Sequence, residues 1–258
     1  MLFSVGLRLE PTATASHGIS ALDIDLLHKS SKPRLTLLAT VIGLAISCGE
    51  VLAQELSVAQ KVEGSVVILT HSFPVATNVM GTGFVVSTNG LVVTADHIVL
   101  NEKTGTLQEP IFAIWNLGME LRTVRMKVSH RFKQGTSGRD LAILEPVTPS
   151  RIGSSHLDIG STAIVGDGVI IAGYPLVWDR VKPYPLLRRG SIASTKYDSD
   201  GDRVLVLDLP SLKGYSGSPV VDANTGLVVG VLSRAPKRPE TGFSLAYVIT
   251  SADLRPNR

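Results

Sequence analysis

Residues Gly81–His97 have the sequence GTGFVVSTNGLVVTADH, and this stretch indicates the fold more clearly than any other. It contains two apolar runs separated by Thr88-Asn89-Gly90. An Asn-Gly pair tolerates positive φ and is a strong signal for a tight turn between antiparallel strands. The stretch therefore predicts a β-hairpin whose second strand ends just before a histidine, His97.

The chain after Gln54 continues with short runs rich in Val, Ile and Leu, most of them bounded by Gly, Pro, Asn or Asp. Such runs are typical of β-strands. Helical periodicity is weak outside residues 52–63 and the last few residues. About twelve short strands without alternating helices predict an all-β barrel or sandwich. The expected strands are Ser65–Thr70, Gly83–Ser87, Leu91–Thr94, Ile111–Trp115, Arg122–Val128, Leu141–Leu144, Val169–Ala172, Ser191–Lys196, Val204–Leu207, Pro219–Val221, Leu227–Ser233 and Phe243–Ile249.

The strands divide into two halves of about six each. The segment Val147–Ser155 contains Pro and Ser and is the expected hinge between them. We therefore expect a leader over residues 1–53, a first β domain over residues 54–150 and a second over residues 151–258.

The composition is that of a globular protein. Of the 258 residues, 44% are hydrophobic and 18% are charged, which excludes a disordered chain. The net charge of +3 comes from 25 basic and 22 acidic residues, and so small an excess does not favour a nucleic-acid partner. A loose basic cluster is better interpreted as the solvated face of a strand. Its members are Arg122, Arg125, Lys127, Arg131 and Lys133.

The N-terminal region predicts export. The uncharged run Leu35–Ile46 follows several basic residues, and at about 12 residues it suits a signal peptide better than a membrane span. Val51-Leu52-Ala53 predicts cleavage before Gln54. Two alternatives remain open. Ala45-Ile46-Ser47-Cys48 resembles a lipoprotein box, which would make Cys48 a lipid anchor, and the segment could also stay as an uncleaved anchor. We expect a periplasmic or secreted protein that contacts the membrane only through such an anchor.

Cys48 is the only cysteine, and it lies within the predicted leader. The mature domain would therefore contain neither a disulfide nor structural zinc on thiolates. Export without disulfides is typical of bacterial envelope proteins rather than of disulfide-stapled digestive proteases.

The segment Gly214-Tyr215-Ser216-Gly217-Ser218-Pro219 is the most specific chemical signal. Hydrolysis by a serine needs an adjacent base, an acceptor that holds the base, and backbone donors for the oxyanion. Glycines on both sides of Ser216 allow a sharp turn that brings N–H groups to one point. The expected donors are the N–H groups of Gly214 and Ser216. The competing interpretation is an ordinary Gly/Ser/Pro turn.

Two further residues complete the candidate set. His97 follows an apolar strand, where a rigidly held base would lie. Asp140 opens the apolar run Leu141–Leu144, where a carboxylate can be buried and still accept from an imidazole. Either residue alone would be an ordinary surface or turn residue, so the inference depends on all three together.

Together these residues resemble the trypsin-like serine peptidase superfamily. The order His, Asp, Ser is the order that this family uses. The segments Thr94-Ala95-Asp96-His97, Asp140–Leu144 and Gly214–Pro219 are similar to its three motifs, the last in the form found in glutamyl-endopeptidase-like members. Further similarity to HtrA/Deg protease domains lies in Gly81–Phe84, Val165–Asp167, Gly173–Pro175, Arg189–Ile192 and Gly230–Ser233. The resemblance covers about residues 60–250, nearly the whole predicted mature chain.

The resemblance implies a chymotrypsin-like fold of two six-stranded antiparallel Greek-key β-barrels, with the active site in the cleft between them. It also implies that Ser216 is the nucleophile, His97 the general base and then acid, and Asp140 the orienting carboxylate. Ser233 takes the position whose hydroxyl often supports the aspartate. Pro210, Ser233 and Arg234 are candidate substrate-binding residues. No cofactor and no metal are expected.

The sequence departs from the family pattern in two places. Asp96 replaces the small residue that usually precedes the histidine, and it would either perturb the base or point to solvent. Only nine residues follow Ile249, so no PDZ domain is expected.

The substrate preference is weakly encoded. Tryptic members carry an acid six residues before the nucleophile, where this chain has Pro210, so cleavage after Arg or Lys is disfavoured. Small or aliphatic P1 residues are favoured. A preference for Glu at P1 is the open alternative, because Ser218 matches the motif form of the glutamyl-endopeptidase-like members. Asp198, Asp200 and Asp202 alternate as in calcium loops, but Leu209 stands where the distal glutamate would be, so we expect a hairpin tip.

The sequence thus predicts a serine endopeptidase that cleaves proteins or peptides through an acyl-enzyme on Ser216. The alternative is a catalytically inactive, protease-like module that binds peptides or acts as a sensor in the cell envelope.

Overall fold

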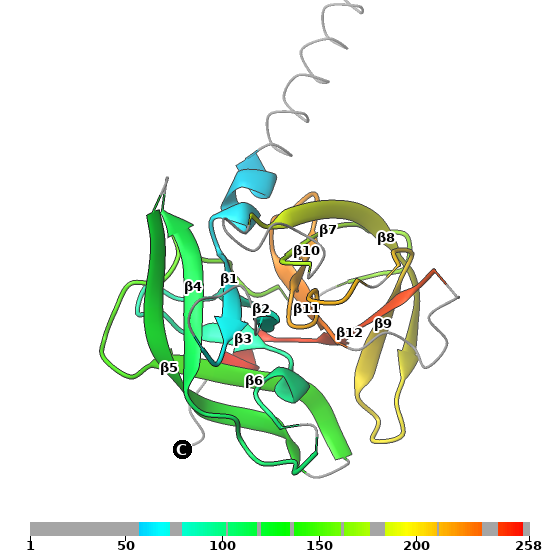
Figure 1. Cartoon of the computed structure of the whole chain (residues 1–258). Coiled ribbons are helices and arrows are strands. Elements are labelled where there is room, and N and C mark those ends of the chain that lie inside the picture. The colour runs from blue at the N-terminus through cyan, green and yellow to red at the C-terminus, as the bar shows by residue number, and fades with distance from the viewer. Residues whose placement is uncertain are drawn as a thin grey trace, which may run out of the picture. The chain divides into compact units, whose positions relative to one another are not determined.

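The structure is a computed structural model that describes residues 57–72, 79–101, 103–117, 120–134, 137–160, 163–175, 184–210, 212–233 and 242–254. Residues 57–63 are helical and lead into the first strand (Figure 1). The predicted leader, Cys48 and Arg234 lie outside the described residues. No helix in the described part of the chain has the length and apolar character needed to cross a membrane.

The first six strands form a closed antiparallel barrel in the order β1-β2-β3-β6-β5-β4. A 3-10 turn, η2 (Asp96–Ile98), follows β3. The strands are β1 (Val66–Thr70), β2 (Val79–Val85), β3 (Val92–Thr94), β4 (Ile111–Leu117), β5 (Glu120–Gln134) and β6 (Ser137–Pro146).

The other six strands form a second closed barrel in the order β10-β11-β12-β9-β8-β7. The chain then continues into a short 3-10 turn, η4 (Ser251–Leu254). The strands are β7 (Gly168–Gly173), β8 (Leu186–Tyr197), β9 (Arg203–Leu207), β10 (Pro219–Asp222), β11 (Val228–Leu232) and β12 (Ser244–Val248). The predicted pair of six-stranded antiparallel barrels is confirmed. The predicted boundary after residue 150 falls between β6 and β7 and stays a prediction.

Several strands are longer than predicted, most clearly β5, β6 and β8. β5 extends to Gln134 although the prediction ended at Val128, and β8 begins at Leu186 instead of Ser191. In β5 the pairing with β6 shifts register after Val128 and again after Arg131. These bulges break the alternation of apolar and polar side chains, so the sequence pattern ended before the strand did.

Apolar side chains form three buried clusters. One fills the first barrel around Val67, Ile111 and Leu144, and another fills the second around Leu205 and Val220. The third joins the barrels, because it contains strand residues of both, from Val66, Phe84 and Leu141 to Ile170 and Val231. This shared core holds the two barrels in one compact unit.

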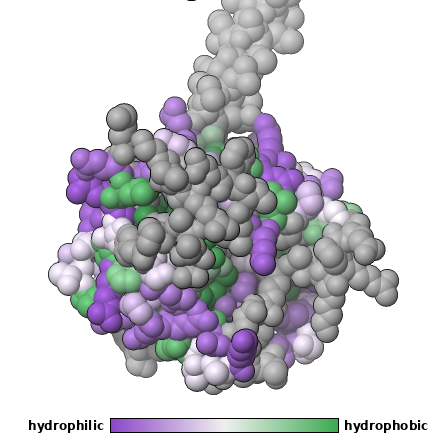
Figure 2. Space-filling view, viewed as in Figure 1, coloured by the Kyte–Doolittle hydropathy of each residue, from purple (hydrophilic) through white to green (hydrophobic). Residues whose placement is uncertain are grey.

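The described surface seen in Figure 2 is mainly hydrophilic, with hydrophobic residues in small scattered groups. Tyr197, Ile164 and Tyr184 are the most exposed large hydrophobic residues in the described part of the chain, at 73%, 66% and 59%. Single exposed apolar residues of this kind are common on soluble domains and need no functional explanation.

Candidate active site

His97 is placed by the β2–β3 hairpin. The hairpin closes where the N–H of Val86 donates to the carbonyl of Leu91 at 2.9 Å, and Gly90 adopts φ +85° in the turn, as expected for the Asn-Gly pair. After β3 the chain enters η2, where the N–H of Val99 donates to the carbonyl of Asp96 at 3.1 Å. His97 therefore lies on a short, hydrogen-bonded turn at the end of a buried strand.

The His97 ring contacts the Asp140 carboxylate. The distance between His97 Nδ1 and Asp140 Oδ2 is 2.7 Å, and the backbone N–H of His97 donates to Asp140 Oδ1 at 2.9 Å. The hydroxyl of Ser233, which follows β11, also donates to Asp140 Oδ2. The carboxylate thus accepts donors from η2 and from the second barrel, and Nδ1 must carry the proton that it shares with Asp140.

The Asp140 residue is buried and only 4% exposed. Burial alone would raise its pKa, but the hydrogen bond and charge of His97, together with the Ser233 hydroxyl, outweigh burial and lower the pKa from 3.8 to about 2. Hydrogen bonds to the charged form of a carboxyl favour that form. Asp140 is therefore ionised throughout the neutral range.

Ser216 lies in a turn that precedes β10 of the second barrel. Gly214 and Gly217 adopt φ +98° and +84°, which side chains with a Cβ rarely adopt. The N–H of Thr82 in β2 donates to the carbonyl of Ser216 at 2.9 Å, and its hydroxyl donates to the carbonyl of Gly214 at 2.8 Å. A Cβ added at Gly217 would lie 3.1 Å from the backbone nitrogen of Ala95. These contacts therefore hold the Ser216 turn against the β2–β3 hairpin, which carries His97.

No hydrogen bond joins the Ser216 hydroxyl to His97 in this structure. Among the described residues, the N–H groups of Gly214 and Ser216 have no acceptor. Two backbone donors next to Ser216 are thus available to a bound group. Serine–histidine contacts are often long without substrate and shorten when substrate binds.

A family model for the trypsin-like peptidase domain matches residues 81–231, which is more than half of the chain. The chain belongs to the trypsin-like peptidase family. The matched region includes His97, Asp140 and Ser216, so all three predicted site residues lie within the family's domain. A search of curated protein sequences gives no match.

Solved structures show the same fold for this peptidase domain. The HtrA-type protease AlgW with a decapeptide matches with a TM-score of 0.55 and 16% identity, over 75% of this chain and 63% of that one. The MamO protease domain from Magnetospirillum magneticum matches with a TM-score of 0.55 and 22% identity, over 75% of this chain and 95% of that one. The serine endoprotease from Yersinia pestis matches with a TM-score of 0.53 and 20% identity, over 77% of this chain and 62% of that one.

This chain therefore spans less than two thirds of the length of the AlgW and Yersinia pestis structures. At these identities the similarity concerns the fold, and it confirms the predicted resemblance to HtrA-like protease domains.

Thr82 holds the Ser216 turn in place through hydrogen bonds, a role that the sequence did not indicate. Besides its two bonds to the Ser216 turn, its Oγ1 accepts the N–H of Tyr174 at 3.0 Å, and its carbonyl accepts the Thr94 hydroxyl at 2.7 Å. The only sequence signal was its place in the Gly81–Phe84 segment, which the resemblance included without assigning a role.

Asp96 does not point to solvent, which was one of the two expectations for it. Its side chain is 0% exposed and pairs with Arg131 of β5. Nε of Arg131 lies 2.6 Å from Oδ1, and Nη2 lies 3.0 Å from Oδ2. Arg131 thus belongs to a buried ion pair and does not serve only as part of a solvated basic face.

Arg139, which precedes Asp140, joins three parts of the chain. Its guanidinium binds both carboxylate oxygens of Asp253 in η4, at 2.8 and 2.6 Å, and lies 3.6 Å from Asp202. It also lies 4.8 Å from the centre of the Phe132 ring. These contacts anchor the start of β6 beside Asp140.

The acidic run Asp198–Asp202 forms the turn between β8 and β9, as predicted for a hairpin tip. Asp198 Oδ1 accepts the N–H groups of Asp200 and Asp202 at 3.0 and 2.9 Å. Asp200 Oδ2 accepts the N–H of Gly138 at 2.9 Å. The carboxylates are therefore engaged in capping the turn and in binding β6.

Pro210 and Ser233, the two predicted substrate-binding residues in the described part of the chain, form separate hydrogen bonds. The carbonyl of Pro210 accepts Nη1 of Arg188 at 2.6 Å, and the N–H of Ser233 donates to the carbonyl of Leu245 at 2.9 Å. A cavity of about 10 Å³ lies between Pro210, Arg188, Tyr215 and the residues Ile171, Leu209, Leu232 and Ser244. Such a volume holds about one water molecule.

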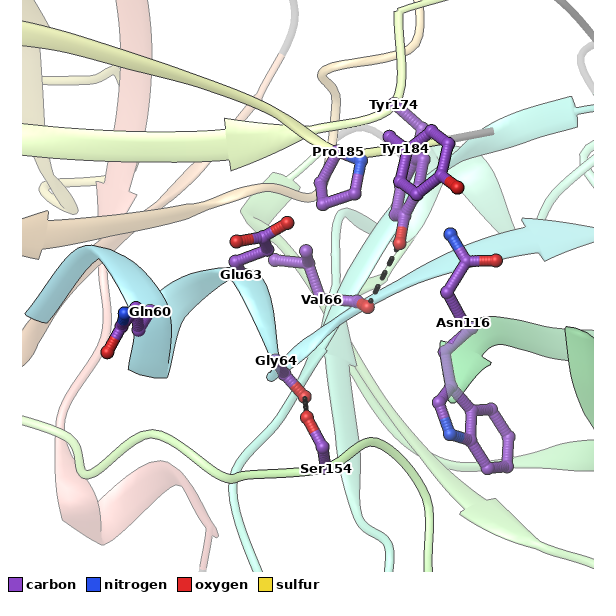
Figure 3. A pocket seen from close by; sticks show the side chains of 10 residues that line it. Gln60, Glu63, Gly64, Val66, Asn116, Ser154, Tyr174, Tyr184 and Pro185 are labelled. Atoms are coloured by element: carbon purple, nitrogen blue, oxygen red, sulfur yellow. Dashed lines mark hydrogen bonds between the residues drawn. The ribbon is translucent and has the colours of Figure 1, made fainter. Parts of the chain in front are cut away.

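A larger pocket of about 260 Å³ has a lining that includes none of these residues. Figure 3 shows the side chains that line it. Tyr174 lines it and donates to the carbonyl of Val66 at 3.4 Å, while the Ser154 hydroxyl donates to the carbonyl of Gly64 at 3.1 Å. Burial, and then the charge of Glu63, raise the pKa of Tyr174. None of His97, Asp140 or Ser216 lines this pocket, so it is separate from the candidate active site.

Proposed function

We propose that this chain is a serine endopeptidase in which Ser216, His97 and Asp140 form the catalytic triad. The observation that carries the proposal is the buried Asp140 carboxylate, which binds His97 through both the ring and the backbone N–H. This arrangement places the proton on Nδ1 and leaves Nε2 as the base, which is the tautomer that a serine nucleophile requires.

The proposed reaction follows from this geometry. His97 Nε2 takes the proton from the Ser216 hydroxyl while Oγ attacks the carbonyl carbon of the peptide, and the N–H groups of Gly214 and Ser216 stabilise the oxyanion. The imidazolium then gives its proton to the leaving amine, and an acyl-enzyme forms. Water, activated by His97, hydrolyses the ester and restores Ser216. Asp140 stabilises the imidazolium in both steps without taking its proton.

The test is the Ser216→Ala variant with casein and a quenched peptide library as substrates. Removal of one half-buried hydroxyl should leave the fold intact and lower kcat by several orders of magnitude. Ser194→Ala, on the exposed face of β8, is the matched control and should retain full activity. The assignment is wrong if Ser216→Ala hydrolyses the substrates as fast as the parent.

A second candidate function is peptide binding without turnover. The missing hydrogen bond between Ser216 and His97 favours it. A fluorophosphonate probe separates the two, because an activated serine hydroxyl forms a phosphonyl ester and an unactivated one does not. Labelling that is lost in Ser216→Ala but kept in Ser194→Ala supports the peptidase.

We also propose that the substrate is a protein or peptide with a small or aliphatic P1 residue. The small cavity beside Tyr215, the neighbour of Ser216, supports this preference because it offers little free volume. Cleavage-site sequencing on a peptide library tests it, and a dominant preference for Arg or Lys would contradict it.

We further propose that the protein is exported, with a mature form that begins at Gln54, at a lipidated Cys48 or with an intact anchor. Mass spectrometry of the mature N-terminus distinguishes these forms, and a full-length cytoplasmic product would contradict export.

A further inference from the structure

The ion pair between Asp96 and Arg131 lies directly beside His97. Asp96 is entirely buried, and Arg131 binds both of its oxygens while remaining 30% exposed. A buried carboxylate is tolerated only when it is paired and hydrogen-bonded, and a two-point guanidinium contact fixes its orientation as well as its charge. The pair therefore fixes the residue that precedes the proposed base.

The ion pair also connects the elements whose spacing sets the contact between His97 and Asp140. Asp96 begins η2, Arg131 lies on β5, and β5 pairs with β6 where Arg131 faces Ala142. Asp140, two residues before Ala142, in turn accepts hydrogen bonds from the backbone N–H and the ring Nδ1 of His97. Contacts thus run in a closed ring from η2 to β5, from β5 to β6, and from β6 back to η2.

No disulfide within the chain can hold these elements together, because the chain contains a single cysteine. The described hydrogen bonds that hold η2 otherwise include its own turn bonds and the bonds to Asp140. Without the Arg131 contact, these remaining bonds, which include the ones that align the His97 ring, would have to hold η2 in place. Small displacements of a catalytic group are costly in rate even where the fold survives.

We infer that Arg131 is a positioning residue for the proposed peptidase reaction and acts on His97 through Asp96. This inference rests on the proposed function. A purely stabilising role is a weaker explanation, because an apolar pair of similar volume is often as stable as a buried ion pair. Arg131 also balances the Asp96 charge, so the unbalanced carboxylate next to His97 is that of Asp140.

The test compares Arg131→Met, Arg131→Lys and the double variant Asp96→Ser/Arg131→Met. Arg131→Met should lower kcat by about 10- to 100-fold without a change in KM, because the misplacement affects the base and not the substrate contacts. Arg131→Lys should recover part of kcat, because an ammonium group keeps the charge but not the two-point geometry. Arg122→Met is the matched control, since Arg122 forms an exposed ion pair with Glu120 on the same strand.

The double variant separates positioning from stability. It removes the unpaired buried carboxylate, so its Tm should recover relative to Arg131→Met, while kcat should stay low because the connection to β5 is lost. Recovery of kcat together with Tm would overturn the inference.

A readout that does not need turnover is the low-field proton resonance of His97 Nδ1–H in Ser216→Ala. We expect Arg131→Met in this background to broaden or shift it, and Arg122→Met to leave it unchanged. An unchanged resonance in folded Arg131→Met would overturn the positioning role. If the parent enzyme hydrolyses nothing, the proposed function fails while this resonance still tests the ion pair.

Discussion

Gly217 allows the close contact between the Ser216 turn and the first barrel, and Gly217→Ala tests that contact. Gly217 has φ +84°, and an alanine there costs about 1–2 kcal/mol from the backbone alone. The added Cβ would also lie within 3.0 Å of the Thr82 carbonyl and the Thr94 hydroxyl. These two groups bind each other at 2.7 Å, so the methyl group must displace a buried hydrogen bond.

Gly201→Ala is the matched control for the backbone cost. Gly201 has φ +83°, and nothing lies within 4 Å of an added Cβ. Overpacking and loss of the hydrogen bond should make Gly217→Ala less stable than Gly201→Ala by about 2–5 kcal/mol.

Urea unfolding followed by tryptophan fluorescence measures this difference in the free energy of unfolding. Peptide hydrolysis should fall in Gly217→Ala even under conditions where the protein stays folded, because the Ser216 turn must move away from β2. Equal stability of the two variants, with full activity in Gly217→Ala, would refute the proposed seating of the turn on Thr82.

Two further predictions concern buried polar groups. Because the pKa of Asp140 falls from 3.8 to about 2 on folding, its contribution to stability is present above pH 3.8 and is lost as the pH falls through about 2. Relative to Asp140→Asn, the wild type should therefore lose about 2 kcal/mol between about pH 6 and pH 2. Urea unfolding across that range checks this, and a pH-independent difference would contradict it. The Ser218 hydroxyl is buried and has no hydrogen-bond partner among the described residues, so Ser218→Ala should be more stable by about 1 kcal/mol and raise Tm by about 2–4 °C. A lower Tm in calorimetry would count against that reasoning.

The strands could be predicted, and the three candidate site residues could be selected, because their signals are local. Leu91–Val93 and Leu141–Leu144 are continuous apolar runs, and the glycines around Ser216 mark a sharp turn within a few residues. His97 and Asp140 both adjoin such runs, so the positions of the ionisable groups followed from the positions of the strands.

The contacts that hold the site could not be predicted, because their partners are far apart in the sequence. Asp96 was expected either to perturb the base or to point to solvent, because its partner Arg131 lies 35 residues later on a strand whose bulges hide the register. Arg139 and Asp253 are separated by 114 residues. Nothing in the local sequence around either residue indicates that the other lies beside it.

The link between Thr82 and Gly214 spans 132 residues and has a consequence for synthesis of the chain. The ribosome produces the whole first barrel, including His97 and Asp140, before Ser216 leaves the exit tunnel. No nascent fragment that lacks the second barrel holds all three groups. If Ser216 acts as proposed, hydrolysis is the last property that the molecule acquires, and a growing chain cannot digest itself or its neighbours.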